Sequence, residues 1–481
     1  MPYKEYDLGQ RSFLGYEPAA CLDEDDPAFL VREFVAHLDL SGIKSHGEVL
    51  GQPAYHPAMM LSILIYGMLR GIFSSRALEA ALGRDMGFIY LAAGQRPCFK
   101  TICNFRNSHA EAIRSLMAQS LAVMRSMGLS IAGCPVLDSS RIRAAANRDK
   151  MIRAADFEEA MKDIEAWERR SSREDEQDDE RWGEENGYLV PKSVMKSAER
   201  RAELKKAIKD AQAQGRKAVS PVDTECAEMR ESNTGRIRPG YALQVAVDKA
   251  SGLITVCDAV NEQYDNDFTL KAVEQHEQNT GEKPHTLDAD SGYYESGVME
   301  ALEKAGIDAC IPDSNTAAAL FDKRRKDKAK QAEEPNIGIN DFEPIEGQDA
   351  WTCPEGHTLK PAGEVRRKGV PHKRYRARQD CRACPLASRC LRKDDNGRRI
   401  IEVSQDHLTI RRNQERFKDE AHRKRYKKRG SFIERIFGHL RRNLRFVQWL
   451  ERGLAKVKTT ATLFALAFNI MVLGSHRLKT A

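Results

Sequence analysis

The sequence lacks the features that mark an exported or membrane-spanning protein. Its opening stretch, MPYKEYDLGQ, is charged and holds no apolar run, so it does not form a secretory signal. Two apolar segments, 59–69 and 461–474, fall short of the roughly 20 residues that a membrane helix needs, and we interpret both as buried helices. The 11 cysteines, odd in number and without an export signal, indicate a reducing compartment rather than a disulfide framework. We therefore predict a cytoplasmic protein with no membrane partner.

Net charge is also small, because 77 Lys and Arg are set against 71 Asp and Glu in 481 residues, a net of +6. The distribution of charge is more informative than the total. Residues 391–458 contain 21 Lys and Arg against 9 Asp and Glu, a net of +12, whereas residues 173–186 form an acidic run. A basic concentration of this kind is typical of a protein that binds a phosphate backbone.

Hydrophobic periodicity predicts several domains of mixed α/β class. The N-terminal part has long apolar helical segments, and Ser74 or Ser75 can cap a helix there. Short β-rich runs alternate with helices later in the chain, which favours a mixed sheet with helices on both faces. The expected order is a helical domain that binds DNA ends (1–130), the start of an α/β core (131–155), a charged helical insertion (156–218), the core continued (219–321), a cysteine-bearing insertion that opens with a loop over 322–335 (322–413), and C-terminal helices of the core (414–481).

Three carboxylates stand out within this pattern. A short strand over 135–138 ends on Asp138. In HTLDADSGYY, Asp288 and Asp290 would point to one face of a strand, and Gly292 lets the chain turn away, so we prefer Asp290 for a site at the strand's end. Glu434 lies at the start of a late helix, at the edge of its apolar stripe.

The residues around Glu434 extend this interpretation. An apolar stripe runs along the predicted helix over Ile433, Ile436, Phe437, Leu440, Leu444 and Val447. Arg441 and Arg445 return to nearly the same helix face as Glu434, which suits either phosphate handling or an ordinary ion-pair surface. Further basic residues are candidates for contacts with DNA phosphates: Lys100, Arg106, Lys424, Arg425, Lys427 and Lys428.

If Asp138, Asp290 and Glu434 converge, they can hold two divalent cations. Mg²⁺ prefers oxygen ligands and keeps several waters, so few protein ligands suffice. Two such ions about 4 Å apart activate an attacking oxygen and neutralise a leaving one at phosphorus.

The chain resembles the DDE transposases of bacterial insertion sequences over nearly its whole length. YHPAMMLSILIYGMLRGIFSSRALE and FKTICNFRNSH are similar to the N-terminal domain of these enzymes. VLDSSRIRAAANRDK resembles their first acidic motif, LDADSGYY the second and YKKRGSFIERIFGHLRR the third. Two details depart from the usual pattern: Ser139 replaces a common Gly, and the gap from Arg429 to Glu434 is one residue longer than in the tightest form.

This resemblance implies an RNase H-like core with Asp138, Asp290 and Glu434 as catalytic residues that bind two Mg²⁺ (or Mn²⁺) ions. It implies cleavage of double-stranded DNA at transposon ends, attack of the freed 3′-hydroxyl on target DNA, and a homo-oligomeric synaptic complex at the nucleoid. It also implies that Tyr426, Arg429 and Arg441 contact phosphates or position the Glu. An RNase H-like nuclease without strand transfer, and a non-catalytic DNA-binding protein derived from a transposase, are the alternatives.

Four cysteines are spaced as candidate ligands of a structural zinc ion. Cys353 stands in TCPEGH, and CRACPLASRC contains Cys381, Cys384 and Cys390. Thiolates two apart on a turn can share one tetrahedral Zn²⁺, and the other pair could complete it. His357 and His372 are alternative ligands. The interpretation without a metal is a set of reduced thiols, some of them packed in a small subdomain.

Overall fold

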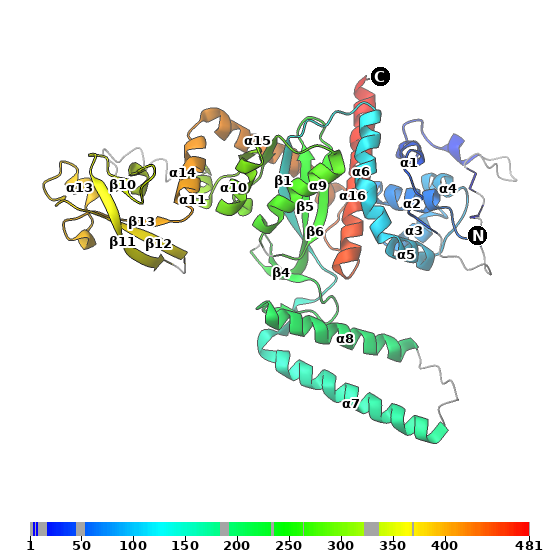
Figure 1. The fold of residues 1–481 in the computed structure, drawn as a ribbon. Coiled ribbons are helices and arrows are strands. Elements are labelled where there is room, and N and C mark those ends of the chain that lie inside the picture. Colours follow the sequence, from blue (N-terminus) through cyan, green and yellow to red (C-terminus); the bar gives the residue numbers. More distant parts are fainter. Residues whose placement is uncertain are drawn as a thin grey trace. The chain divides into compact units, whose positions relative to one another are not determined.

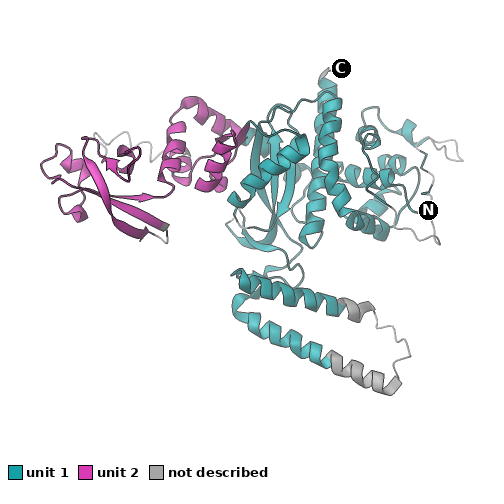
Figure 2. Cartoon of the chain, viewed as in Figure 1, with its two compact units in different colours: residues 1–285, 430–481 teal, residues 286–429 magenta. Residues whose placement is uncertain are grey.

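The structure is a computed structural model of the 481-residue chain. It describes residues 3–4, 6–7, 17–44, 53–182, 192–231, 235–262, 264–321, 336–367 and 370–480. The loop predicted over 322–335 lies outside these residues. The described chain is a mixture of helices and strands (Figure 1). It divides into two compact units, residues 1–285 with 430–481 and residues 286–429, which are described separately (Figure 2).

The N-terminal part of unit 1 is helical, as predicted. Three of its helices begin at acidic or hydroxyl caps: Asp26, Ser74 and Asp85 each accept a backbone N–H from the first helical turn. Ser74, and not Ser75, is therefore the cap of its helix. The helices are α1 (Pro27–Ala36), α2 (Pro57–Leu69), α3 (Ser75–Ala81), α4 (Met86–Leu91), α5 (Phe99–Ser108) and α6 (Ala110–Ser126).

The sheet of unit 1 is built around one long strand, β5 (Ile237–Asp248), whose residues are almost all buried. Three strands pair with β5 in antiparallel fashion: β1 (Pro135–Arg143), β4 (Ala227–Arg230) and β6 (Ile254–Val260). A short pair, β2 (Ile152–Arg153) with β3 (Ala218–Val219), stands apart, and α9 (Thr269–Thr280) packs against β6 and α6.

The last helix, α16 (Leu454–Thr480), is the centre of the core of unit 1. It packs along α6, α2 and β6, and Figure 1 shows it lying beside α6. By length and composition alone the segment Leu454–Lys479 could cross a membrane, but most of its apolar window is buried by the rest of the protein. Hydrophobic burial by the protein's own helices accounts for this composition, which confirms the predicted buried helix.

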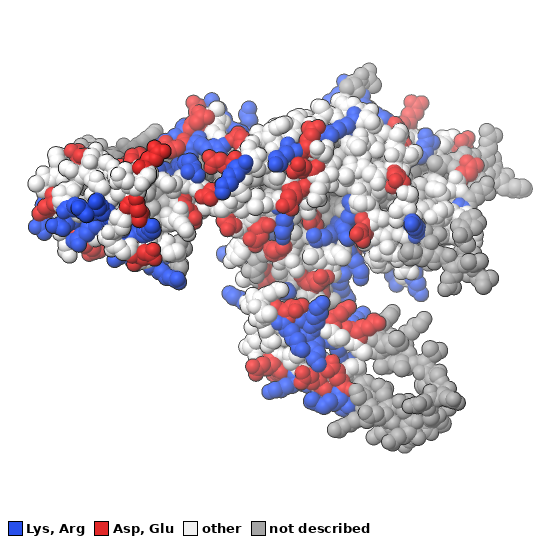
Figure 3. Space-filling view, viewed as in Figure 1, with Lys and Arg blue, Asp and Glu red and all other residues white. Residues whose placement is uncertain are grey.

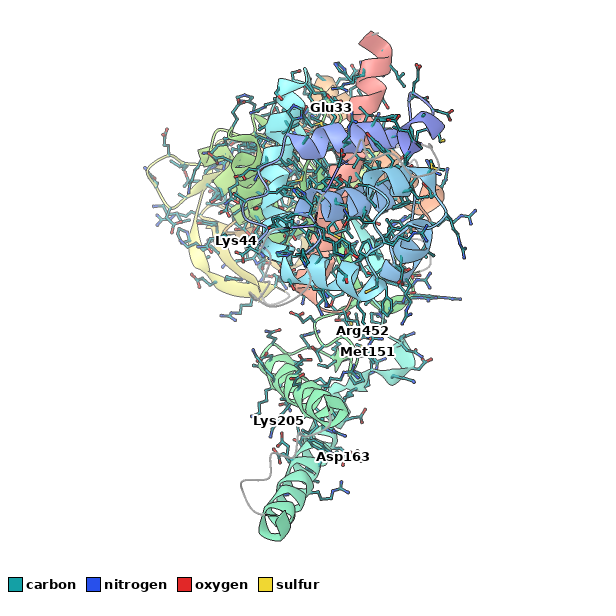
Figure 4. The ribbon with its side chains drawn as sticks, turned by 90° about the vertical axis from the view of Figure 1, so that its right-hand side faces the viewer. Glu33, Lys44, Met151, Asp163, Lys205 and Arg452 are labelled. Atoms are coloured by element: carbon teal, nitrogen blue, oxygen red, sulfur yellow. The ribbon has the colours of Figure 1, made fainter. Side chains whose placement is uncertain are left out.

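The charged insertion forms two long helices, α7 (Phe157–Trp182) and α8 (Lys192–Ala213). A small apolar cluster, with Phe157, Ile164 and Ile208 at its centre, joins the two helices near their shared base. Figure 4 places Asp163 on α7 and Lys205 on α8, and Figure 3 shows acidic and basic side chains interleaved over this hairpin. Lys205 pairs with Glu168 across the hairpin at 2.7 Å. The described residues of the charged insertion therefore form a hairpin of two helices.

Unit 2 begins with a parallel pair, β7 (Thr286–Asp288) and β8 (Asp308–Cys310), joined through α10 (Ser296–Lys304). Then follow α11 (Ser314–Phe321) and a five-stranded antiparallel sheet of order β13-β12-β11-β10-β9. Its strands are β9 (Glu343–Pro344), β10 (Trp351–Thr352), β11 (Thr358–Arg367), β12 (Val370–Ala377) and β13 (Ile400–Ser404). The cysteine-bearing insertion over 322–413, whose sequence shows no regular hydrophobic pattern, therefore contains a sheet.

The polypeptide leaves unit 2 through helices. α13 (Ala387–Cys390) precedes β13, and α14 (His407–Arg416) follows it. α15 (Glu420–Gly438) then crosses the boundary between the units, which falls between Arg429 and Gly430. A π-helical turn, His439–Asn443, ends this region.

Candidate active site and nucleic-acid interface

Asp138 lies in the middle of β1, not at its end as predicted. The strand continues to Arg143 because β5 is long enough to pair with all nine of its residues, and Asp138 stands opposite Val245. Val136 and Leu137 before it are buried, whereas the Asp138 side chain is half-buried and accepts the N–H of Ser139 at 2.7 Å. A well-paired strand therefore presents this carboxylate at a fixed position.

Glu434 lies in the last turns of α15 and is exposed, so the prediction that it starts its helix is wrong. Its neighbours Ile433 and Ile436 are buried in the core of unit 1 and fix this face of the helix. The carboxylate lies over the turn before it: a Cβ placed on Gly430 would stand 3.2 Å from Oε1 of Glu434. Glycine at 430 thus leaves room for the carboxylate.

The helix that carries Glu434, α15, ends before the predicted apolar stripe does, since that stripe extends to Val447. Because α15 ends at Gly438 and a π-helical turn follows, Arg441 and Arg445 do not continue the Glu434 face of a regular helix. Arg445 has a positive φ of 55°, and the Val447 residue, predicted as buried, is 52% exposed. The predicted helical periodicity holds only as far as the π-helical turn.

The chain after Glu434 is instead anchored on β1. The guanidinium of Arg441 donates a hydrogen bond of 2.7 Å to the hydroxyl of Ser140, two residues after Asp138. Further along, the N–H of Trp449 donates to the carbonyl of Arg143 at 2.8 Å. Unit 1 therefore ties the segment that follows Glu434 to the strand that carries Asp138.

The second acidic motif, in unit 2, separates its two aspartates by environment. Asp288 ends β7, is fully buried, and forms an ion pair with Arg425 at 2.6 Å. Asp290 lies two residues beyond the strand, is half-buried, and accepts the N–H of Gly292 at 2.8 Å. A carboxylate neutralised in the interior is poorly placed to bind a metal ion, which favours Asp290 over Asp288.

Arg425 is the centre of this buried network. It bonds Asp288 and also Asp308 of the neighbouring strand β8. Burial disfavours the charge of Arg425, but its bonds to Asp288 and Asp308 outweigh burial and raise its pKa. The sequence analysis predicts that Arg425 binds DNA. Its role in a buried ion-pair network has no local sequence signal, because its partners lie more than a hundred residues earlier.

Tyr426 and Arg429 lie close to each other and to the second motif. Tyr426 is 5% exposed, and the guanidinium carbon of Arg429 stands 5.5 Å from the centre of its ring. Burial raises the pKa of Tyr426, Arg429 opposes that shift, and the charge of Asp290 adds to it. Unit 2 thus gathers three of the residues that the resemblance assigns to the site.

The remaining predicted basic residues fall into two groups. Arg106 is buried in an ion pair with Glu451, with 2.7 Å between nitrogen and oxygen, so its assignment to DNA contacts is corrected. Lys424 pairs with Glu420 at 2.9 Å on the surface of α15. The side chains of Lys100, Lys427 and Lys428 are exposed, as a phosphate contact requires.

The four predicted zinc-ligand cysteines line one cavity of about 340 Å³ in unit 2, together with His357. The N–H of His357 donates to Sγ of Cys353 at 3.3 Å, and burial and the neighbouring cysteines raise the pKa of Cys390. His372 lies on β12, opposite Ser404. Within the described part of the chain, no three His, Cys, Asp or Glu side chains stand in a metal-binding arrangement.

Comparison with known families agrees with the resemblance. Residues 19–108 match the family described as Transposase domain (DUF772), and residues 352–474 match the family described as Transposase DDE domain. The second match includes Glu434 and the four cysteines, whereas Asp138 and Asp290 lie outside both matches. No curated protein matches the chain. The two matches, each over part of the chain, support its resemblance to the DDE transposases of insertion sequences.

Proposed function

We propose that the chain is a DNA transposase that cleaves DNA at transposon ends and joins the freed 3′-hydroxyl to target DNA. The observation that carries this proposal is the pair of transposase matches, one at each end of the chain, with Glu434 inside the DDE match. The anchoring of the segment after Glu434 on the strand of Asp138 supports it. The reaction would take place on double-stranded DNA within a homo-oligomeric complex at the nucleoid.

In this proposal the catalytic core is RNase H-like, and Asp138, Asp290 and Glu434 hold Mg²⁺ or Mn²⁺. The donor set suits these ions, because carboxylate oxygens are their preferred ligands. Divalent cations held by these three carboxylates would activate the attacking oxygen and neutralise the leaving oxygen. None of the three carboxylates is fully buried, in contrast to Asp288.

The other residues of the site position groups or contact phosphate. Arg441 holds the segment after Glu434 on β1 through Ser140. Arg429, stacked over Tyr426, offers a cation for a DNA phosphate near Asp290. Exposed Lys427 and Lys428 extend this basic surface along α15, and Lys100 adds a cation on α5.

A test uses the full chain and a supercoiled plasmid that carries the DNA flanking the gene on both sides. We expect Mg²⁺-dependent cleavage at the ends and joined products with a labelled end fragment. Asp290→Asn should abolish both without loss of DNA binding. Asp163→Asn, an exposed aspartate on α7, is the matched control and should leave both reactions intact. Cleavage that survives Asp290→Asn would remove Asp290 from the site.

The same experiment separates the alternative functions. Cleavage without joined products would identify a nuclease that only hydrolyses. DNA binding without cleavage, in Mg²⁺ and in Mn²⁺, would identify a non-catalytic DNA-binding protein.

For the cysteine cavity we propose a structural zinc ion held by Cys353, Cys381, Cys384 and Cys390. The four thiols share one cavity, and four cysteine sulfurs are a common ligand set of structural zinc. Because these side chains do not already form a metal-binding group among the described residues, the proposal includes a change of cysteine rotamers on zinc binding. Purified protein should hold one equivalent of zinc by elemental analysis, and Cys384→Ser should lose it, whereas Cys98→Ser should not. Metal-free protein with an unchanged melting temperature would contradict the proposal.

A further inference from the structure

Two cavities of unit 1 lie at opposite ends of α16 and differ in charge. The cavity at its C-terminal end, about 460 Å³ in volume, is lined by Arg435 and His439 from α15 and its π-helical turn, and by His476 and Lys479 from α16. None of the described residues that line it is an aspartate or glutamate. We call it the cationic cavity.

The cavity at the N-terminal end of α16 serves as a comparison. It is about 750 Å³ in volume, and Arg452, labelled in Figure 4, and Lys456 are among its cations. Four carboxylates also line it: Glu203, Asp210, Asp223 and Glu225. Two of these already accept the first N–H groups of the helix, with Asp223 bonded to Gly453 at 3.1 Å and Glu225 to Leu454 at 2.8 Å. Protein carboxylates therefore compensate the positive charge at this end.

The cations of the cationic cavity have no such compensation. Neither Arg435 nor Lys479 forms an ion pair among the described residues. The guanidinium of Arg435 lies against the turn between β5 and β6, where a Cβ on Gly252 would come within 2.9 Å of its nitrogen. Gly252 has φ +74°, so glycine both makes this turn and lets the cation approach it.

The neutral groups that line the cavity also favour an anion. The side-chain nitrogen of Asn443 stands 3.0 Å from Nδ1 of His439. With the amide as donor, Nδ1 accepts and the proton of a neutral imidazole lies on Nε2, which is then a donor. Ser251 and Ser475 add hydroxyl groups to the lining. The cavity thus offers charged and neutral donors together.

Cations near a helix C-terminus also have a structural use, because they offset the helix dipole. The C-terminal ends of α15 and α16 contribute about half a negative charge each. Two permanent cations, Arg435 and Lys479, already exceed that total before either histidine is protonated. Dipole compensation alone therefore leaves a positive excess.

We infer that the cationic cavity binds a backbone phosphate of DNA, as a contact separate from the catalytic carboxylates. This inference rests on the proposed function. Arg435 directly follows Glu434 in the chain, so a phosphate held here would fix the DNA beside the helix that carries the catalytic glutamate. The chemistry recognised is a phosphate oxygen, which DNA presents and which inorganic phosphate shares.

The test measures DNA affinity against salt concentration for the full chain. Each phosphate contact contributes about 0.9 to the slope of log K against log salt. Replacing both cations, Arg435→Gln with Lys479→Gln, should lower the slope by about 0.9, the share of one phosphate contact, and weaken binding several-fold at moderate salt. The matched pair, Arg452→Gln with Lys456→Gln, removes one arginine and one lysine from the compensated cavity and should leave the slope nearly unchanged. The charge-conserving pair, Arg435→Lys with Lys479→Arg, should retain most of it.

The outcomes distinguish this inference from the proposed function. Equal slope changes in both cavities, or none in the cationic cavity, would overturn the inference while DNA binding by the wild type stands. A wild type that binds no DNA would overturn both. In a calorimetric titration with inorganic phosphate, binding that Arg435→Gln with Lys479→Gln abolishes, together with an unchanged DNA slope, would identify a site for free phosphate and overturn the assignment to DNA.

Discussion

Two arginines, one in each unit, hold the strands that carry the first and second acidic motifs, and they do so in different ways. In unit 2, Arg425 bonds the carboxylate of Asp288 in the interior. In unit 1, Arg441 bonds the neutral hydroxyl of Ser140, and Asp138 two residues earlier is half-buried. An arginine that neutralises a buried carboxylate supports the fold. An arginine that bonds a nearby serine hydroxyl supports the fold and leaves the carboxylate of the motif available.

The largest effect that follows from this contrast is the loss of Arg425. In Arg425→Ala, Asp288, whose side chain is 1% exposed, would lose the cation that pairs with it in the interior. We expect the free energy of unfolding to fall by about 3–5 kcal/mol, as for other broken buried pairs. Denaturant unfolding and hydrogen exchange of β7 and β8 would measure it.

The matched control is Arg416→Ala. Arg416 also pairs with Asp308, but its side chain is 39% exposed and that of Asp308 48% exposed. Such a pair contributes only about 0–1 kcal/mol. Equal losses from the two substitutions would show that burial does not govern the role of these arginines.

A second buried pair extends the comparison to unit 1. The side chains of Arg106 and Glu451 are 8% and 4% exposed. Arg106→Ala should cost about 3 kcal/mol by leaving Glu451 buried and unpaired, and replacing both residues by apolar ones of similar size should recover most of that loss. In the folded fraction, DNA affinity and its salt slope should match the wild type. A lower slope would instead return Arg106 to the DNA-binding residues.

The elements predicted best from sequence have strong, continuous apolar patterns. The apolar run of α16 and the capped start of α3 each carry their signal within a short stretch. The sheet β9–β13 was missed because its long strands show no alternation: most of β11 is exposed on both faces. The extension of β1 beyond Asp138 depends on pairing with a strand about a hundred residues later.

In the candidate site, too, some features have a local sequence signal and others depend on distant residues. Spacing and resemblance were enough to prefer Asp290, since Gly292 signals the turn that it caps. The argument against Asp288 as a metal ligand is its bond to Arg425, which lies 137 residues away. No local sequence pattern reveals this bond. The structural roles of Arg106 and Arg425 were missed for the same reason, because a count of basic residues along the chain does not show which of them face a carboxylate.

A smaller effect is expected from the arginine of unit 1. In Arg441→Ala the hydroxyl of Ser140 loses one hydrogen bond but no charge is left unpaired. The free energy of unfolding should fall by about 1 kcal/mol, and a double-mutant cycle with Ser140→Ala should give a coupling of similar size. A loss as large as that of Arg425→Ala would mean that Arg441 bonds more than the serine.

The smallest effect concerns an exposed network in unit 2. Arg367 bonds Glu402 at 2.7 Å, and Arg374 bonds it as well, and these contacts lower the pKa of Glu402 from 4.5 to about 2. A lowered folded-state pKa contributes stability above the unfolded-state value, and this contribution is lost as the pH falls from about 4.5 towards 2. Since the arginines are largely exposed, solvent screening should keep it below about 1 kcal/mol. The opening free energy of β12 and β13, taken from hydrogen exchange corrected for the intrinsic exchange rate at each pH, should therefore fall in this pH window. Glu402→Gln should reduce this fall, whereas Glu346→Gln, an exposed glutamate of the same unit, should not. An equal fall in wild type and Glu402→Gln would assign the acid sensitivity of this sheet to other carboxylates.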